Sequence, residues 1–292
     1  MRKWARGVLL GLFLLAFTGA NALADSLEAA DAGIREAAGA NRLILLGEKH
    51  GTREIPRLVG RLVDAYTLEG PVLLALEMPA SEQAPLHRYL ASNGRAAARA
   101  ALMSTPFWTI QGDQHDGRRS HDMIDLVEAV RGLKSQGRDV SLMAYDVERG
   151  PPLSANHRDQ QMAKRVRAAF SALPRGRLLV LGGNVHAMLA KPANAPAEMP
   201  VPMGYWLRDL APWSVDIVAG SGAFWGCRDS CKAIEITGPR PRTGALENDR
   251  YDAVTIAAVA DDEETLRLLL SLGASAKLTT SRYDGTALIA AA

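Results

Sequence analysis

The chain has 292 residues, of which 48% are hydrophobic, 23% are charged and 5% are aromatic. This composition is typical of a globular protein, and it excludes an intrinsically disordered chain, a collagen-like fibre and, with only two cysteines, a disulfide-rich scaffold. The formal net charge is +2 at neutral pH. A nucleic-acid-binding protein would need a strong basic excess, so we expect no nucleic-acid partner.

Residues 1–24 have the pattern of a secretory signal peptide. Three basic residues among the first six precede an uncharged apolar run over 8–20, and Ala22 and Ala24 form an A-x-A cleavage pattern. The apolar run is shorter than the roughly 20 residues that a membrane-spanning helix needs, which favours cleavage over an uncleaved anchor. Cleavage would leave 31 basic and 32 acidic side chains. We expect an exported protein, periplasmic or secreted, with no stable membrane span.

Alternating strands and helices are predicted over residues 25–240. Four short apolar runs are typical of strands that are buried on both faces of a parallel sheet, and they cover residues 42–48, 71–77, 140–146 and 177–182. Amphipathic helices are predicted over 54–67, 122–136 and 157–173, and further strands over 215–218 and 233–237. This alternation predicts an α/β domain with a mostly parallel mixed sheet flanked by helices.

A linker and an ankyrin-like tail are predicted over residues 241–292. The sequence T-I-A-A at 255–258 returns as L-I-A-A at 288–291, an offset equal to the 33-residue ankyrin period. About three such repeats are needed for stability. We therefore expect either that the natural chain is longer or that a protein partner covers this end. The alternative is that two alanine-rich helices merely resemble each other.

The two cysteines, Cys227 and Cys231, are separated by three residues. In an oxidising compartment so close a pair most simply forms a local disulfide. A thioredoxin-like redox site would have a C-x-x-C motif, and a zinc site would need more Cys or His nearby. The sequence therefore predicts a disulfide that fixes a loop.

Polar side chains follow each of the four predicted strands. They are Glu48 and His50 after the first strand, Glu77 after the second, Asp146 after the third, and Asn184 and His186 after the fourth. Because parallel strands direct their carboxyl ends to one edge of a sheet, we expect these side chains to meet there. Two glutamates and two histidines suit either a divalent-metal site of unknown identity or an acid–base site around a polarised water.

Four motifs resemble those of the superfamily that includes erythromycin esterase, Tiki proteases and ChaN haem-uptake proteins. They are L-L-G-E-K-H-G-T-R-E at 45–54, L-E-M-P at 76–79, H-R-D-Q-Q-M-A at 157–163 and G-N-V-H-A at 183–187. They occur in the family's order across residues 41–222. The G-T-R-E that follows the histidine is most similar to the esterase branch, while one residue between Glu and His is nearer to ChaN. The resemblance implies the same α/β fold.

The resemblance implies different roles for the same residues in different branches. In the esterase branch, His50 would be the base that activates water, oriented by Glu48 and Glu77. In the Tiki branch, these three residues and His186 would hold a divalent metal ion. The ChaN branch implies haem-binding uptake without enzymatic activity.

Arg53 and Arg158 would bind substrate or stabilise an oxyanion, with Asn184 and Asp146 as further substrate contacts. An alternative for Arg158 is an ion pair with Asp159 in the first turn of a helix. The charged segment 107–122 is a second candidate for a loop that lines the pocket, with Ser120 as the N-cap of the following helix. A solvated, self-paired loop is the alternative for this segment.

Three functions therefore remain open on the sequence. The first is a hydrolase acting on a small-molecule or peptide substrate. The sequence has none of the G-x-S-x-G, H-E-x-x-H, Walker or G-x-G-x-x-G motifs that mark common enzyme classes. The second is a haem-binding uptake protein. The third is an interaction protein whose ankyrin-like tail recruits a protein partner.

Overall fold

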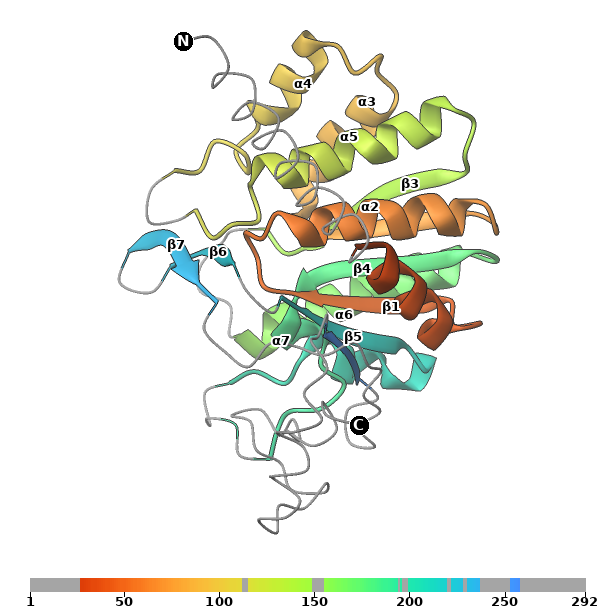
Figure 1. The fold of residues 1–292 in the computed structure, drawn as a ribbon, viewed down its shortest axis with the longest axis vertical. Helices are drawn as coiled ribbons and strands as arrows, with labels where there is room; N and C mark the ends of the chain where they lie inside the picture. Colours follow the sequence, from red (N-terminus) through yellow and green to blue (C-terminus); the bar gives the residue numbers. More distant parts are fainter. Residues whose placement is uncertain are drawn as a thin grey trace, which may run out of the picture.

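The computed structural model describes residues 27–111, 115–148, 155–193, 195, 199–219, 222–227, 230–236 and 253–257. The predicted signal peptide and most of the predicted tail lie outside these residues. Figure 1 shows a twisted sheet with helices on both of its faces. In the part of the chain that is described, no helix is both long enough and apolar enough to cross a bilayer.

The main sheet is parallel throughout. Its strands, in spatial order, are β3 (Val140–Asp146), β2 (Val72–Pro79), β4 (Arg177–Gly183), β1 (Leu43–Glu48), β5 (Trp213–Val218) and β8 (Ala253–Ala257). Every pair of neighbours runs in the same direction. The predicted α/β fold with a sheet flanked by helices is confirmed. Among the described residues the main sheet is parallel and not mixed, because the antiparallel pair found there, β6 (Ala223–Cys227) with β7 (Cys231–Glu235), forms a separate hairpin.

Helices cover both faces of the sheet because its strands are apolar on both faces. One face packs against residues 27–38, which are helical, and against α2 (Glu54–Thr67), α3 (Gln83–Leu90), α4 (Ala96–Met103) and α5 (His121–Ser135). The other face packs against α6 (Ala155–Ala172), the 3-10 helix η3 (Met203–Leu210) and the short α7 (Asn184–Ala187). A 3-10 turn, η1 (Ala80–Glu82), follows β2.

The side chains of β1 illustrate how the two cores are separated. Ile44 and Leu46 are buried in the core beneath α2 and α5, whereas Leu43 and Leu45 are buried in the core beneath α6. Successive residues of a strand point to opposite faces. A central strand of this kind must therefore be apolar throughout, as the sequence predicts.

The element boundaries agree closely with the sequence in the sheet and its helices. Helix α2 has the predicted bounds, and α5 begins one residue earlier than predicted. The N-cap assigned to Ser120 is confirmed, because its Oγ accepts a hydrogen bond of 3.1 Å from the backbone N–H of Met123.

The C-terminal tail gives a different result. Residues 253–257 form β8 at the edge of the sheet, where an ankyrin repeat would place a helix. The rest of the predicted tail lies outside the described residues, so the ankyrin-like repeat stays a prediction. The predicted disulfide also stays a prediction, although the hairpin register pairs Cys227 with Cys231 as such a bridge requires.

Candidate functional site

Three carboxylates lie at the carboxyl edge of the parallel sheet, as the strand ends predict. Glu48 is the last residue of β1, Asp146 is the last residue of β3, and Glu77 lies two residues before the end of β2. Each of these residues is at most 6% exposed. Buried carboxylates need charged or hydrogen-bonding partners. The partners found here are two histidines and two arginines, which join the three carboxylates into one cluster.

His50 bridges the two glutamates. Its Nδ1 lies 2.9 Å from Oε1 of Glu48, and its Nε2 lies 3.5 Å from Oε2 of Glu77. Glu48 lies on the same face of the sheet as Leu46, and Glu77 lies on the same face as Ala75, because residues two apart in a strand share a face. Leu46 and Ala75 belong to the cores on opposite faces of the sheet. The imidazole therefore spans the edge of the sheet and joins its two faces.

The protonation of His50 follows from these neighbours. Burial by itself would lower the pKa of His50, but the negative charges of Glu77 and Glu48 and the hydrogen bonds with them outweigh burial and raise it to about 10. His50 is thus an imidazolium at neutral pH in the free protein. With a carboxylate at each nitrogen, both of its N–H groups have an acceptor.

Glu77 is the centre of the cluster. Its Oε1 accepts hydrogen bonds from Arg118 at 2.9 Å and Arg158 at 2.6 Å, and its Oε2 accepts one from the backbone N–H of Gly183 at 2.7 Å. Burial would raise the pKa of Glu77, but the positive charges of His50 and Arg118 hold it well below its usual value. Glu77 is therefore a fixed negative charge, not a proton acceptor.

The two arginines also bind Asp146. Arg158 donates to Asp146 from Nε at 2.9 Å and from Nη2 at 2.8 Å, and Arg118 donates from Nη1 at 3.1 Å. Arg118 pairs in addition with Asp116, at 2.6 Å. Burial opposes the ionisation of Asp116, but this guanidinium lowers its pKa to about 2. These charges fix the guanidinium groups beside Glu77.

His186 completes the cluster from α7, directly after β4. Its Nε2 lies 2.9 Å from Nη1 of Arg158, and its Nδ1 lies 2.7 Å from Oδ1 of Asp159. Because a guanidinium only donates hydrogen bonds, Nε2 is the acceptor and Nδ1 carries the proton. The same oxygen of Asp159 accepts the backbone N–H of Met203 at 2.7 Å, which fixes the carboxylate.

The structure brings together six of the eight side chains that the sequence singled out. They are Glu48, His50, Glu77, Asp146, Arg158 and His186. Arg53 lies outside the cluster: its side chain is 67% exposed and its Nε is 3.9 Å from Asp122. Asn184 is likewise not part of the cluster: its amide nitrogen lies 3.5 Å from Oδ2 of Asp216.

Two residues of the cluster were not assigned from the sequence. Arg118 belongs to the charged segment 107–122, but nothing in the sequence separates it from Arg119, which binds the carbonyl oxygen of Phe107. Asp159 was expected at most to pair with Arg158. The structure instead directs Asp159 to His186 and Arg158 into the cluster. Only the packing of α6 against the sheet decides between these alternatives.

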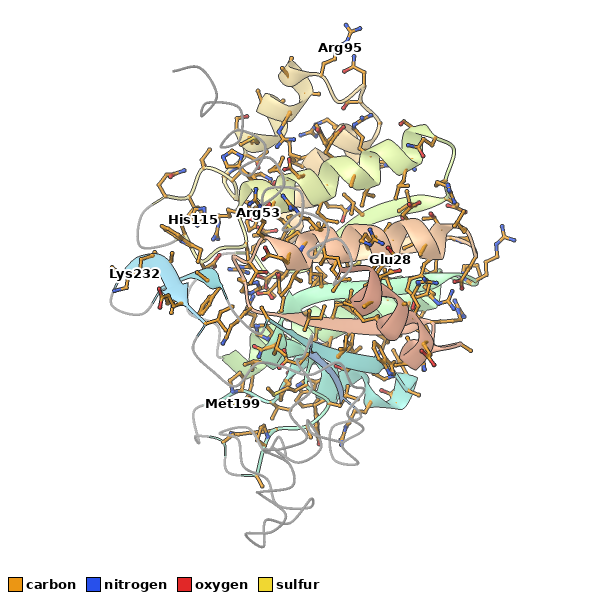
Figure 2. All side chains as sticks on the ribbon, in the orientation of Figure 1. Glu28, Arg53, Arg95, His115, Met199 and Lys232 are labelled. Atoms are coloured by element: carbon orange, nitrogen blue, oxygen red, sulfur yellow. The ribbon has the colours of Figure 1, made fainter. Side chains whose placement is uncertain are left out.

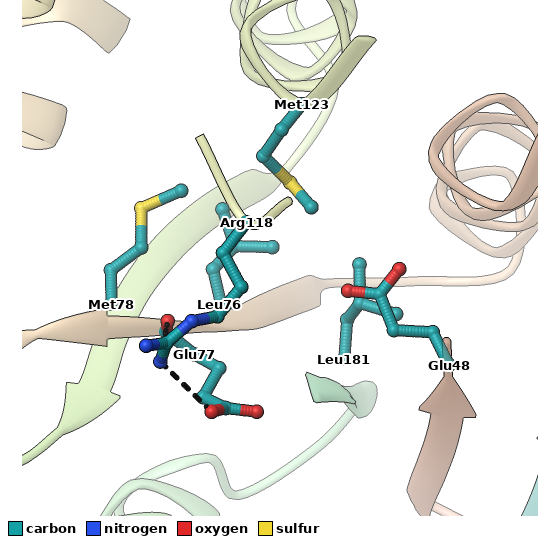
Figure 3. Close-up of a pocket in the computed structure, with 7 residues that line it drawn as sticks. All are labelled: Glu48, Leu76, Glu77, Met78, Arg118, Met123 and Leu181. Carbon is teal, nitrogen blue, oxygen red and sulfur yellow. Dashed lines mark hydrogen bonds and ion pairs between the residues drawn. The ribbon is translucent and has the colours of Figure 1, made fainter. Parts of the chain in front are cut away.

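A small cavity adjoins the cluster on the side of α5. Figure 3 shows it between the carboxylate of Glu48 and the guanidinium of Arg118, with Glu77 beside Arg118. Its remaining walls are apolar, from Leu76, Met78, Met123 and Leu181. Its volume of about 10 Å³ is close to what one water molecule requires. A haem macrocycle does not fit this cavity, so the haem hypothesis gains no support from it and stays a prediction.

The cluster as arranged does not fit a divalent metal ion. Within the described residues, no group of three or more His, Cys, Asp or Glu side chains is placed to bind one. Oε1 of Glu77 accepts hydrogen bonds from both guanidinium groups, and Nε2 of His186 faces Nη1 of Arg158. A cation at these atoms would be repelled by the arginines.

His50 and His186 both lie close to the backbone of Gly183. A methyl group on Gly183 would lie 3.1 Å from Nε2 of His50, 3.5 Å from Cδ2 of His186 and 3.7 Å from Oε2 of Glu77. Glycine at this position therefore lets Nε2 of His50 approach the end of β4 closely, where a larger residue would crowd the ring.

Comparison with known proteins gives the fold but no family. No family model and no curated protein matches the chain. Among solved structures, it is similar to a succinoglycan biosynthesis protein, with a TM-score of 0.54 and 12% identity over 71% of this chain and 74% of the other. It is also similar to a mutant of erythromycin esterase EreC in its open conformation, with a TM-score of 0.51 and 13% identity over 82% of each chain.

These similarities agree with the fold that the four motifs predicted. At 12% and 13% identity they establish the α/β architecture alone. Activity must be argued from the side chains of the site.

Proposed function

We propose that the protein is a hydrolase that cleaves an ester or amide bond with a water molecule activated at His50. The observation that carries this proposal is the His50 geometry: Oε1 of Glu48 lies 2.9 Å from Nδ1, whereas Nε2 has a longer contact, 3.5 Å to Glu77, and lies beside Gly183, which has no side chain to cover it. A histidine held by a carboxylate at one nitrogen and more loosely contacted at the other is the arrangement that general-base catalysis uses.

The proposed reaction moves one proton through Nε2 of His50. Neutral His50 takes a proton from water as the water oxygen bonds to the carbonyl carbon. The bond to the leaving group then breaks, and the leaving oxygen or nitrogen takes that proton from His50. Glu48 accepts the Nδ1–H throughout, which keeps the lone pair of the neutral ring on Nε2.

The arginines supply the positive charge for the developing oxyanion. Arg118 and Arg158 are both held by Glu77 and Asp146 at distances of 2.6–3.1 Å. Their positions are thus fixed before the substrate arrives, and a preorganised cation stabilises a transition state without reorganisation. The substrate class that this favours is a small molecule or peptide with a hydrolysable carbonyl.

The pH dependence of hydrolysis tests the role of His50. Only the neutral ring can take a proton from water, and the pKa of about 10 leaves the neutral form a minor species at neutral pH. With a panel of activated esters, log kcat/KM should therefore rise with unit slope from about pH 6 and level off near pH 10.

Two results would contradict this proposal. Hydrolysis no faster than in buffer for every ester of the panel would remove the enzymatic function. A rate that is constant up to pH 9 and falls above it would show that His50 donates a proton instead of accepting one.

A substitution at Gly183 tests whether hydrolysis depends on the placement of Nε2 of His50. The backbone angles of Gly183, φ −54° and ψ 138°, are open to any residue, so Gly183→Ala should fold. Its methyl group would lie 3.1 Å from Nε2 of His50, so the imidazole would have to shift away from Gly183. We expect kcat/KM to fall at least about tenfold, which is about 1.4 kcal/mol of the barrier, with little change in Tm.

The matched control is Gly132→Ala, because Gly132 lies in α5 with no atom within 4 Å of the added methyl group. It should leave hydrolysis unchanged and raise Tm slightly, as alanine favours a helix. Equal activity of Gly183→Ala and Gly132→Ala would show that hydrolysis does not depend on the placement of Nε2 of His50.

A further inference from the structure

The β6–β7 hairpin contacts two loops that carry site residues. One loop, residues 49–52, follows β1 and carries His50; the other, residues 115–118, precedes α5 and carries Arg118. Figure 2 shows His115 beside the hairpin that carries Lys232. Neither the motifs nor the hydrolase proposal gives this hairpin a role.

Trp225 of β6 binds both loops. Its backbone N–H donates to the carbonyl oxygen of Gly51 at 3.0 Å, and its indole Nε1–H donates to the carbonyl oxygen of His115 at 2.7 Å. The Trp225 and His115 rings also pack edge to face, with centroids 5.8 Å apart. A single side chain and its backbone thus connect the two loops.

Two glycines allow the three segments to approach this closely. A methyl group on Gly51 would lie 2.5–2.8 Å from Trp225 atoms, and one on Gly117 would lie 2.7 Å from the backbone of Gly51 and 2.9 Å from the carbonyl oxygen of Trp225. Both glycines have left-handed backbones, with φ of +79° and +89°. The loops are therefore in backbone contact with each other and with β6.

A third contact fixes the loop of His50. The ammonium group of Lys49 lies 5.0 Å from the centre of the Phe224 ring, within cation–π distance. Residues 49–51 are thus held to β6 on either side of His50, by Lys49 and by Gly51. The imidazole has to span from Glu48 to Glu77, so a displaced loop would break one of its two contacts.

We propose that Trp225 is a positioning residue, through which the β6–β7 hairpin holds His50 and Arg118 against Glu77. The proposal rests on the proposed function only for its kinetic consequence. Its structural consequence, the placement of the two loops, can be measured whether or not the protein is a hydrolase.

The test compares Trp225→Phe with Trp206→Phe. Phenylalanine keeps the ring but removes the indole N–H that binds His115. Trp206 is a matched control, because it is similarly exposed (36% against 38%) and packs edge to face on Tyr205 in η3. Trp225→Ala is a second variant that removes the ring contact as well. Tm values report whether each variant folds.

Two measurements follow the loops. Amide hydrogen exchange in residues 49–52 and 115–118 should become at least about fivefold faster in Trp225→Phe, the effect of losing one hydrogen bond. The ring nitrogen NMR shifts of His50, which report its contacts with Glu48 and Glu77, should move in Trp225→Ala. Neither should change in Trp206→Phe. Unchanged exchange and unchanged His50 shifts in both Trp225 variants would overturn the proposal.

The kinetic measurement uses the activated esters that wild type hydrolyses. We expect Trp225→Phe to lower kcat about tenfold with KM within about twofold, since misplaced catalytic groups lower the rate of the chemical step. Faster exchange with unchanged kcat would overturn the positioning role. If wild type hydrolyses none of the esters, the proposed function fails, and the exchange and NMR results still decide whether Trp225 holds the loops.

Discussion

Replacing His50 with glutamine should lower kcat/KM for ester hydrolysis by about 10²–10⁴-fold, the usual contribution of a general base. Glutamine keeps a polar side chain between Glu48 and Glu77 but cannot take a proton from water. Because His50 is 21% exposed at its side chain and lies in a loop, the variant should fold. Initial rates at pH 9, where wild type has more of the neutral ring than at pH 7, give the most sensitive comparison.

The control for this experiment is Arg53→Ala. Arg53 was also a candidate on the sequence, and it lies three residues after His50, but its side chain is 67% exposed and directed to Asp122. We expect wild-type kinetics from this variant. If His50→Gln retains the activity of Arg53→Ala, the hydrolysis does not depend on His50 and the proposed mechanism is wrong.

The sheet and the carboxylate cluster could be predicted because they follow from local sequence. Each of the four predicted strands is a nearly unbroken apolar run, and a parallel sheet directs all their carboxyl ends to one edge. Glu48, Glu77 and Asp146 each terminate or nearly terminate such a run. Their convergence therefore required no knowledge of loop conformation.

The arginines and the hairpin could not be predicted in the same way. Arg118 and Arg119 are adjacent in one loop, and the turn at Gly117 decides which of them faces Glu77. The partner of Trp225 is a carbonyl oxygen 110 residues away. Contacts of this kind depend on how loops close over a finished sheet, and no periodicity in the sequence encodes them.

The metal hypothesis depended on the same missing information. Two glutamates and two histidines at a sheet edge suit a divalent ion when they are the only charged groups present. The sequence did not reveal that Arg118 and Arg158 both donate to Glu77. With these guanidinium groups in place, the carboxylates have cationic partners within the protein itself.

Replacing Glu77 with glutamine should cause the largest loss of stability among single substitutions at the site. The side chain is buried and pairs with Arg118, Arg158 and His50. Removing its charge leaves buried cations with too few partners, which typically destabilises a protein by about 3–5 kcal/mol. In a domain of this size, that corresponds to a decrease in Tm on the order of 10 °C.

An exposed ion pair provides the control for Glu77→Gln. Asp209 accepts hydrogen bonds from Arg167 at the surface, and Asp209→Asn removes the same charge there. Solvent and salt screen such pairs, so we expect no measurable change in Tm. Equal Tm changes in the two variants would show that Glu77 is not the centre of the cluster.

The pH dependence of the Glu77→Gln effect separates lost charge from lost packing. The pKa of Glu77 is lowered in the folded protein, so its contribution to stability is fully present above the unfolded value of about 4.5 and is lost as the pH falls through the folded value. The difference in Tm between wild type and Glu77→Gln should therefore be large at pH 7 and shrink at acidic pH. A difference that is independent of pH would mean that the variant perturbs packing.

In Glu77→Gln the pKa of His50 should also fall from about 10, because Glu77 is the strongest of the charges that raise it. NMR titration of the His50 ring measures this pKa directly.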